Sequence, residues 1–290
     1  MNKIPLIIDT DLTRDDIVAV AMAANCGKYD IKAISCYGEW FVETVQLRDS
    51  LGLDCPVCWG AMKPLFRQEN GDDIYGNTDA DFDGKTSIST KDEDYPWDRI
   101  YSEAVKAQGK LEIVTLGPVT NIALTLLRYP QIKPLIKHIF CFAGSAYKGN
   151  ILPYSEYNAY SDPDALKIVF DSGIAVTMCG LDGIESCAVE TGEIKNIHSL
   201  NDMVEKSMQI YRRTNEADVS IESAAAMSCY IDSDAVQTKD FYVAVETKIG
   251  ITRGQTIVDR LGKYKKAPNI RVVTAGNRKA FIENLKNIEK

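Results

Sequence analysis

The 290-residue sequence predicts an α/β domain with a mainly parallel central sheet and helices on both of its faces. Short runs rich in isoleucine and valine recur along the chain, each about as long as a strand that is buried on both faces. Stretches with apolar residues at helical spacing lie between these runs. Because this alternation is typical of parallel sheets, we expect the ligand site beyond the carboxyl ends of the strands.

The expected elements follow one another in a regular order. The strands are expected at residues 6–8, 31–36, 113–116, 138–142 and 175–178. The helices are expected at residues 17–25, 42–53, 119–127 and 164–172. No internal repeat or flexible linker interrupts this order, so residues 1–290 are predicted to form a single domain.

Two segments lack this periodicity and are predicted to be loops. Residues 61–95 are rich in glycine and aspartate and have little apolar periodicity, as in a long loop over a site. Residues 144–161 lie between a strand and a helix and contain Tyr147, Tyr154, Tyr157 and Tyr160. These rings could stack on a nucleobase or cover the end of the sheet.

The composition excludes several classes of protein. With 45% hydrophobic residues the chain is too apolar to be disordered, and 41 acidic against 33 basic residues disfavour nucleic acid as a partner. The first apolar run reaches Asp9 too soon for a signal peptide or a membrane span, so we expect a cytoplasmic protein with no membrane partner. Its eight cysteines are then expected to be reduced thiols.

Four carboxylates follow the first strand within eight residues: Asp9, Asp11, Asp15 and Asp16. Helix capping is one interpretation, because Thr13 and Asp16 have the spacing of a capping box. Capping leaves Asp9 and Asp11 unexplained, and four close negative charges are costly unless protons or a cation neutralise them. A hard divalent cation with oxygen ligands is the natural partner.

The same string, Asp9-Thr10-Asp11-Leu12-Thr13, also resembles the nucleophile motif of the haloacid-dehalogenase phosphatases. In that interpretation Asp9 attacks phosphorus, Asp11 is the acid/base and Mg²⁺ is bound. The later acidic motif of that superfamily has only Gly180-Leu181-Asp182-Gly183 as a candidate, with one carboxylate. The phosphatase is therefore kept as an alternative.

The whole chain resembles the inosine/uridine-preferring nucleoside hydrolase family, whose hallmark D-x-D-x-x-x-D-D is matched by the four aspartates. Leu12-Thr13 replaces the Pro-Gly that is usual inside this motif. Further similar segments follow in the family's order along almost the full length. They are Leu116 to Ala123, Gly149-Asn150, Glu156-Tyr157-Asn158, Asp162 to Ala165, Arg253 to Thr256 and Val258-Asp259.

This resemblance implies a Ca²⁺-dependent ribohydrolase that cleaves the N-glycosidic bond of a small-molecule nucleoside or related ribosyl compound. Asp11, Asp16 and the carbonyl of Leu116 would bind Ca²⁺, and Asp11 would also take the proton of the attacking water. Asp9 would lie behind these ligands. The ribose hydroxyls would be held by Asp15, Asn150, Glu156 and Asn158. The family is commonly dimeric or tetrameric, so a homo-oligomer is expected.

One pair departs from the family pattern. The family has a His-Asp pair that supplies a Ca²⁺ ligand and, in many members, the acid that protonates the leaving base; the corresponding residues are Glu222-Ser223. Glu222, or Glu39 after the second strand, could replace the lost carboxylate, and Glu222, Tyr154 or solvent could protonate the base. The alternative is a catalytically weak pseudoenzyme that binds nucleoside or ribose without turnover.

Three other motifs resemble functional sites but are expected to be structural or solvent-exposed. Residues 79–84 resemble half of an EF-hand loop, but no glutamate stands in the twelfth place, so a solvated acidic lid is favoured. Cys55 and Cys58 form a C-x-x-C on a strand-like segment, which favours buried thiols over zinc or redox chemistry. Both histidines, His138 and His198, are expected to be structural or solvated.

Overall fold

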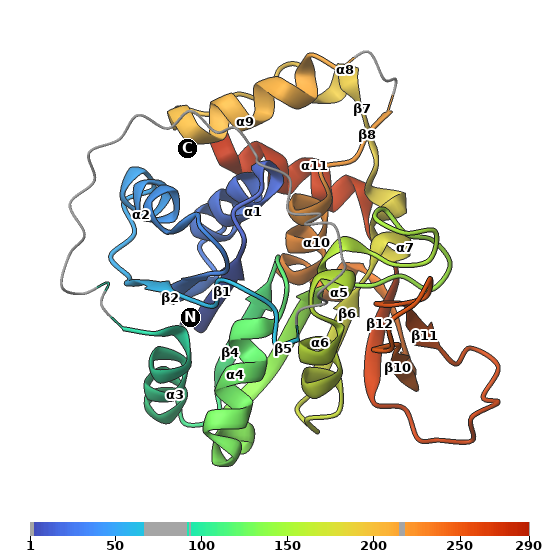
Figure 1. Cartoon of the computed structure of the whole chain (residues 1–290). Helices are drawn as coiled ribbons and strands as arrows, with labels where there is room; N and C mark the ends of the chain where they lie inside the picture. Colours follow the sequence, from blue (N-terminus) through green and yellow to red (C-terminus); the bar gives the residue numbers. More distant parts are fainter. Residues whose placement is uncertain (1–2, 67–91, 93, 215–217, 290) are drawn as a thin grey trace.

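The computed structural model describes residues 3–66, 92, 94–214 and 218–289. Eight strands form one sheet in the order β3-β2-β1-β4-β5-β6-β12-β9 (Figure 1). Their bounds are β1 Ile4–Thr10, β2 Tyr29–Cys36, β3 Val57–Trp59, β4 Leu111–Thr115, β5 Ile136–Phe142, β6 Val176–Cys179, β9 Gln237–Phe241 and β12 Ile270–Ala275. All neighbours in this sheet are parallel except β9, which pairs antiparallel with β12.

Helices cover both faces of the sheet (Figure 1). The helices of at least eight residues are α1 Arg14–Asn25, α2 Phe41–Ser50, α3 Pro96–Ala107, α4 Thr120–Arg128, α6 Pro163–Phe170, α9 Asp202–Arg212, α10 Glu222–Ile231 and α11 Arg278–Lys286. The short ones are α5 Tyr157–Ser161, α7 Leu181–Ile184 and α8 Thr191–Ile194, with 3₁₀ turns at Pro130–Leu135, Glu185–Cys187, Ser233–Ala235 and Asn287–Glu289. The expected α/β architecture is confirmed.

Strand β1 shows why the layers form. Its apolar side chains alternate between the two faces of the sheet, as strand geometry requires. Leu6 and Ile8 belong to a core cluster with residues of α1, α10 and α11, whereas Ile7 belongs to the opposite cluster with residues of α3, α4 and α6. All three side chains are fully buried, so the strand reads as a continuous apolar run.

The position of β1 sets the place of the site. The chain moves outward from β1 to β2 and β3 on one side, and from β4 to β5 and β6 on the other. The strand order therefore reverses between β1 and β4, and in such sheets the crevice at the reversal is where ligands bind. Asp9, near the carboxyl end of β1, pairs in register with Ser35 of β2 and Thr115 of β4.

Three local predictions need correction. The helix expected to run to residue 53 ends at Ser50, because the chain turns at Gly52, whose φ of 65° lies in the left-handed region. The expected irregular stretch 144–161 ends in the short helix α5, which Glu156 caps. The capping box at α1 is absent: Thr13 is the N-cap, but its side chain accepts no hydrogen bond from the helix backbone, and its hydroxyl instead donates to Asp15 at 2.8 Å.

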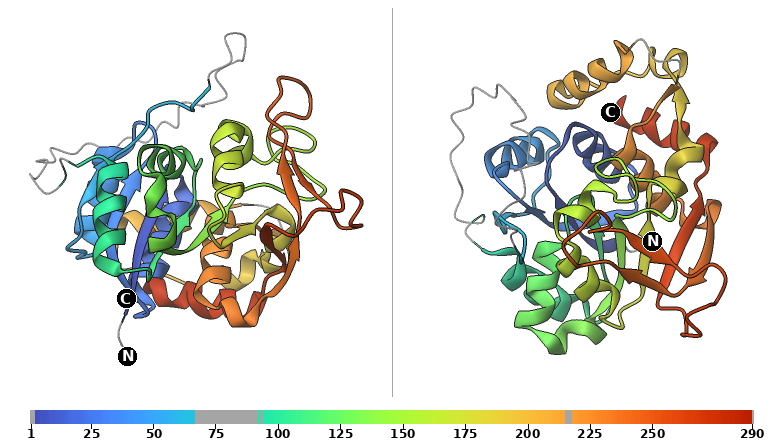
Figure 2. Two further views of the ribbon diagram at one scale, coloured as in Figure 1. Left: turned by 90° about the horizontal axis from the view of Figure 1, so that it is seen from below. Right: turned by 45° about the vertical axis from the view of Figure 1, so that its right-hand side comes forward.

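The C-terminal part adds elements without a counterpart in the predicted pattern. Strands β10 (Val243–Val245) and β11 (Thr256–Val258) form a hairpin, which projects from the body of the molecule in Figure 2. Strands β7 (Val189–Glu190) and β8 (Asp218–Val219) form a second small sheet. Within the described residues no helix combines the length and apolar character that crossing a membrane requires.

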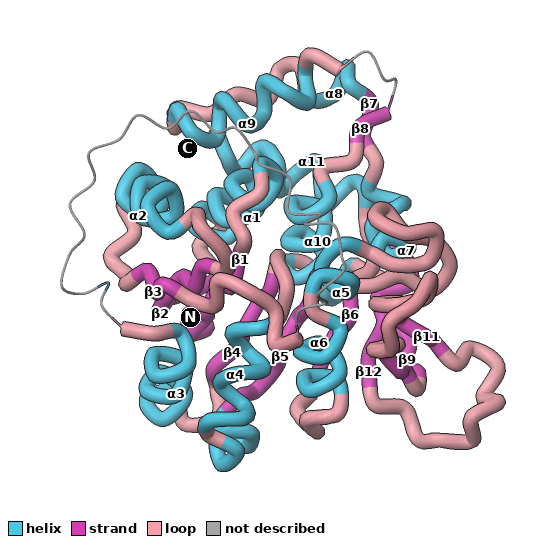
Figure 3. The backbone as a smooth tube through the Cα atoms, viewed as in Figure 1, coloured by secondary structure: helices cyan, strands magenta, loops and turns pink. Residues whose placement is uncertain are grey.

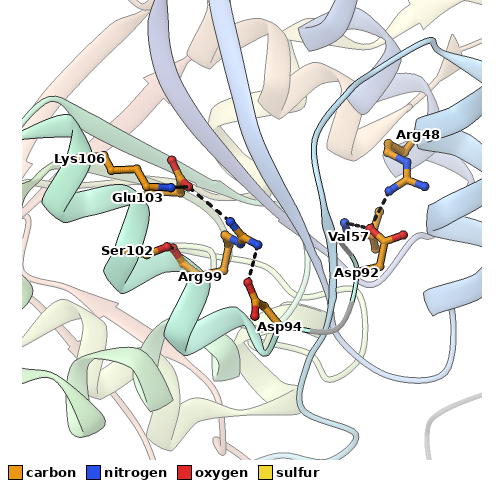
Figure 4. A network of polar contacts seen from close by, with 8 residues as sticks. All are labelled: Arg48, Val57, Asp92, Asp94, Arg99, Ser102, Glu103 and Lys106. Atoms are coloured by element: carbon orange, nitrogen blue, oxygen red, sulfur yellow. Dashed lines mark hydrogen bonds and ion pairs between the residues drawn. The ribbon is translucent and has the colours of Figure 1, made fainter. Parts of the chain in front are cut away.

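Polar side chains fix the chain on both sides of the segment 67–91. Asp92 is buried and accepts hydrogen bonds from the Arg48 guanidinium at 2.7 Å and from the Val57 backbone at 2.8 Å (Figure 4). Farther along, Arg99 of α3 pairs with Asp94. On the other side, the Leu65 N–H donates to Asp162 at 2.8 Å.

Candidate functional site

Asp9 is a fully buried carboxylate at the carboxyl end of β1. Its Oδ1 accepts hydrogen bonds from the Ser35 hydroxyl and, at 2.9 Å, from the Asn121 side chain. Burial raises its pKa to about 7, although these two bonds act in the opposite direction. Its Oδ2 is buried and has no hydrogen-bond partner among the described residues. Asp9 therefore lies behind the site, with one oxygen fixed and one unsatisfied.

Asp16 and Asp11 form the acidic centre of the site. Asp16 is fully buried in the first turn of α1, and its Oδ2 accepts a hydrogen bond from the Thr10 hydroxyl at 2.5 Å. Asp11 is hydrogen-bonded to Asp16, and the pKa of each is raised by burial first and then by neighbouring carboxylates. Hydrogen bonds from Ser223 and Thr10 partly offset the rise at Asp16. Asp16 Oδ1 is buried without a partner in the described part of the chain.

Asp11 is also held close to the loop after β4. A Cβ atom on Gly117 would lie 2.9 Å from the Asp11 Cγ and from its backbone nitrogen. Only glycine allows this approach, which brings Asp11 beside the backbone that follows Leu116. The loops after β1 and β4 thus meet at the reversal of strand order.

Asp15 and Ser223 join α1 to α10. The Ser223 N–H, in the first turn of α10, donates to Asp15 Oδ2 at 2.8 Å. A carboxylate at this position also interacts favourably with the positive end of the helix dipole. The other Asp15 oxygen accepts the Thr13 hydroxyl, so this aspartate is held on both sides.

The loop after β5 adds a framework of amide and carboxylate groups. Asn158 donates from its Nδ2 to the carbonyls of Leu116, at 2.7 Å, and Phe142, at 2.9 Å. Both amide hydrogens are thereby used, so only its Oδ1 could accept a ribose hydroxyl. Glu156 caps α5 by accepting from the backbone N–H groups of Asn158, Ala159 and Gly144. Burial nevertheless raises the Glu156 pKa to about 7.

Asn150 and Glu222 lie at the open side of the site. Asn150 donates to Glu222 Oε2 at 3.3 Å and accepts from the Tyr157 N–H at 2.8 Å. Burial, and then the charge of Asp15, raise the pKa of Glu222. Both side chains line a cavity of about 250 Å³ with Lys148, Gly149, Leu181, Ile184, Glu185, Ala188 and Ser220. The loop from β5 to α5 that carries Asn150 is seen beside α7 in Figure 3.

The structure thus brings most predicted residues to one edge of the sheet, but not into one cavity. Asp15 and Asp16 adjoin the start of α10, and Asp11 adjoins Asp16. Asn158 holds the Leu116 carbonyl, and of the predicted site residues Asn150 and Glu222 are the ones among the described cavity lining. Glu39 is exposed, outside this set of contacts.

The residues present fit a divalent cation in part. The orphaned Asp16 Oδ1, the adjacent Asp11 and the Leu116 carbonyl are hard oxygen donors of the kind that Ca²⁺ prefers. Ser223 adds no carboxylate. No group of three or more His, Cys, Asp or Glu side chains close enough to hold a metal occurs within the described ranges. The donor set is therefore two carboxylates and backbone oxygen.

Several polar residues of this site were not predicted from the sequence. Thr10, Ser35 and Asn121 orient Asp16 and Asp9, and Asn121 also accepts the Ala61 N–H at 2.8 Å. A signal existed for Ser35, because it stands at the carboxyl end of an expected strand. Serine and threonine are common at strand ends, however, and only the register places Ser35 opposite Asp9.

The other motifs that could have carried chemistry have structural roles where the structure describes them. His138 lies in β5 and contacts Thr177 at 2.9 Å, and His198 contacts Glu205 at 3.3 Å. Cys55 and Cys58 are buried and form no disulfide, as is the case for Cys141 and Cys179 in their strands. Asp182 accepts the hydroxyl of Ser145 at 2.9 Å. The EF-hand-like residues 79–84 lie outside the described residues.

The tyrosines are not among the residues that line the cavity in the described structure. The Arg260 guanidinium covers the Tyr147 ring at 4.1 Å from its centre, and Tyr154 is exposed. Stacking of Tyr154, Tyr157 or Tyr160 on a base stays a prediction.

The fold and the buried carboxylates at its reversal point define a class of α/β proteins that bind small polar ligands at one sheet edge. The sequence model of the inosine-uridine preferring nucleoside hydrolases matches residues 6–283, and the chain belongs to this family. This confirms the predicted family and, at the level of the family, an N-ribohydrolase in place of the haloacid-dehalogenase phosphatase.

Known proteins are similar to this one along almost the whole chain. The pyrimidine-specific ribonucleoside hydrolase RihA of Photobacterium profundum is 30% identical, with 97% of each chain covered. The non-specific ribonucleoside hydrolase RihC of Escherichia fergusonii is also 30% identical, with 96% of each covered. The structure of a purine-preferring ribonucleoside hydrolase from Gardnerella vaginalis matches with a TM-score of 0.83 at 23% identity, over 98% of this chain and 97% of that one.

Proposed function

We propose that this protein hydrolyses the N-glycosidic bond of ribonucleosides or related ribosyl compounds, and that it depends on Ca²⁺ for this activity. Membership of the nucleoside hydrolase family supports the reaction. The observation that carries the metal dependence is the buried, unpartnered Asp16 Oδ1 beside Asp11. An isolated buried carboxylate oxygen is costly, and a divalent cation would compensate for it.

In this proposal Asp11, Asp16 and the Leu116 carbonyl hold the cation. When bound, Ca²⁺ would position the attacking water and make it more acidic. Asp11 takes the proton of that water, because it is the less enclosed member of the acidic pair. Asn158, by holding the Leu116 carbonyl at 2.7 Å, positions one ligand.

The ribose is held by Asp15, Asn150, Glu156 and Asn158. Carboxylates near the sugar favour the positive charge that develops on it as the glycosidic bond breaks. Hydroxyl contacts that strengthen at that stage lower the barrier further. Asp9, hydrogen-bonded to Ser35 and Asn121, supports the loop from behind.

Within the described residues, the end of the site that faces the departing base lacks a histidine that could protonate this base. Glu222 accepts a hydrogen bond from Asn150, and it is our candidate for the group that faces the departing base. No histidine adjoins it in the described structure, since His138 and His198 have partners elsewhere. We therefore expect nitrophenyl riboside, whose leaving group needs no proton, to be cleaved faster than inosine.

Asp16→Ala tests the proposal. We expect it to abolish both Ca²⁺ binding, measured by titration calorimetry, and hydrolysis of nitrophenyl riboside, because it removes two ligand oxygens and a charge. Asp30→Ala, at the start of β2, is the control and should retain both. Unchanged turnover in Asp16→Ala, or full turnover of the native protein in excess chelator, would contradict the metal role.

A weak pseudoenzyme is the second candidate, and the serine at position 223 favours it because it adds no charge to the metal shell. Binding of inosine with no turnover of inosine or nitrophenyl riboside at saturating Ca²⁺ would support this candidate. A homo-oligomer and a cytoplasmic location remain predictions.

A further inference from the structure

The leaving-group end of the site has a distinctive charge. The cavity that Glu222 lines contains a second acid, Glu185, and one basic side chain, Lys148, within the described lining. The Lys148 ammonium lies 3.1 Å from the Glu185 carboxylate, so these two opposite charges offset each other. Glu222 forms no ion pair among the described residues, and the positive charge of Lys148 acts on it more weakly than the negative charge of Asp15. Glu156 adds further negative potential.

The volume and the lining of the cavity suit a group of moderate size with both apolar and polar atoms. Its volume of about 250 Å³ lies below the range of about 300–1,000 Å³ that is usual for drug-sized ligands. Leu181, Ile184 and Ala188 supply apolar wall, and Ser220 and Asn150 supply polar atoms. A heteroaromatic base with an edge that carries positive charge would complement this surface.

The chemistry of the leaving group leads to the same conclusion. A neutral base must gain a proton as the glycosidic bond breaks, or it departs as an unstable anion. A base that is already cationic departs as a neutral molecule when it takes the bonding electron pair, so it needs no acid. Water then adds to the ribosyl carbon and loses its proton to Asp11.

We propose that Glu222 acts as a carboxylate counter-ion that makes this site selective for ribosides of cationic bases. Both N-ribosyl pyridinium compounds and purine ribonucleosides alkylated at N7 have this chemistry. The inference rests on the proposed ribohydrolase function and specifies its substrate class.

The test compares matched substrates in the native protein and Glu222→Gln with Ca²⁺ present. We expect the ratio of kcat/KM for N7-methylguanosine to that for guanosine to fall at least fivefold in Glu222→Gln, the factor that about 1 kcal/mol represents. The ratio for nicotinamide riboside to uridine should fall likewise. Comparing ratios between proteins cancels the faster intrinsic cleavage of alkylated bases.

Two further variants make the result specific. Glu222→Asp keeps the charge and should restore most of the ratio. Asp240→Asn removes one exposed charge from β9, paired with Arg271, and should leave the ratio unchanged. A fall confined to one of the two substrate pairs would show which cationic base the site accepts.

Other outcomes would overturn the inference. If Glu222→Gln slows the neutral substrates guanosine and uridine more than the cationic ones, Glu222 is a proton donor and the counter-ion role is wrong. Equal slowing of both would also contradict it. Neither result affects the proposed hydrolase function, which fails only if nitrophenyl riboside and all nucleosides are inert. In that case calorimetric affinities for N7-methylguanosine and guanosine, in both proteins, still decide the charge preference.

Discussion

Asp9 and Asp16 share an unusual state at the level of single residues. Each is fully buried, each has one oxygen bonded to a hydroxyl, and each has a second oxygen without a partner among the described residues. A folded chain does not gain stability from such groups. They are the feature that a ligand with positive charge would explain.

Ser223→Asp should strengthen Ca²⁺ binding. Ser223 interacts with Asp16 and with Asp15, so an aspartate here would add a third carboxylate to the acidic centre. Because affinity for Ca²⁺ rises with the charge of its ligands, we expect the dissociation constant to fall about tenfold. Titration calorimetry measures it, and Ser223→Asn, similar in size but neutral, is the control. Equal affinities of the two variants would contradict the prediction.

Glu156 gives the folded protein a defined pH dependence. Its pKa is about 7 in the folded protein, against 4.5 for an ordinary glutamate. The protonated form therefore stabilises the fold below about pH 4.5, and this contribution is lost as the pH rises through about 7. The unfolding free energy of the native protein minus that of Glu156→Gln should decrease by about 3 kcal/mol across this window.

Urea unfolding in calcium-free buffer measures this difference. Glu205 provides a control of opposite sign, because the Arg212 hydrogen bond lowers its pKa to about 2. Its stabilisation is present above about pH 4.5 and is lost as the pH falls through about 2. A difference between native and Glu156→Gln protein that does not change with pH would contradict the assignment.

The sequence predicted the acidic residues of the site better than their supports. Asp9, Asp11, Asp15 and Asp16 are conspicuous because four like charges in eight residues need an explanation. The roles of Thr10, Ser35 and Asn121 depend on which strands are neighbours, which local sequence does not reveal. The predicted capping box was wrong because the Asp16 side chain accepts a hydrogen bond from Thr10 in the buried site and does not turn back to the start of its own helix.

At the level of elements, the buried strands and their helices were predictable and the C-terminal elements were not. Strands β1, β2, β4, β5 and β6 are apolar runs buried from both faces, which leaves a clear pattern. Strand β9 is exposed along most of its length, and β10 and β11 have three residues each. Such short or exposed strands form because a neighbour is already in place, so their own sequence carries little signal.

Arg48→Ala should destabilise the junction of α2, β3 and the chain before α3. Arg48 and Asp92 are both buried, and the alanine variant would leave the aspartate with an uncompensated charge (Figure 4). We expect a loss of about 3–5 kcal/mol in unfolding free energy, measured by urea denaturation. Lys106→Ala removes an exposed ammonium that pairs with Glu103 on α3, and it should cost less than about 1 kcal/mol because Arg99 still pairs with Glu103. Equal effects of the two variants would show that burial does not matter here.

At the level of the whole molecule, N-terminal and C-terminal elements form one core. Helix α1 packs against α10, α11 and the final 3₁₀ turn, and Asn284 of α11 donates to Ser228 of α10 at 2.9 Å. The helix that carries Glu222 and Ser223 is therefore supported from both ends of the chain.

A chain that ends at residue 269 should not fold. It lacks β12, which covers the edge of β6, and α11, which packs on α10. We expect it to show no cooperative thermal transition by circular dichroism, whereas a chain lacking only Lys290 should unfold like the 290-residue chain. A cooperative transition in the truncated chain would show that the first part is an independent domain.

Helix α11 completes the core around α1, and this order has a consequence for biosynthesis. A bacterial or eukaryotic ribosome adds about 5–20 residues per second, so tens of seconds separate the appearance of α1 from that of α11. During this time Val18, Val20 and Met22 of α1, all fully buried in the finished protein, lack part of their final cover. Until α11 has been synthesised, the apolar side chains of α1 lack this cover, and we expect the nascent chain to bind chaperones that recognise exposed apolar segments.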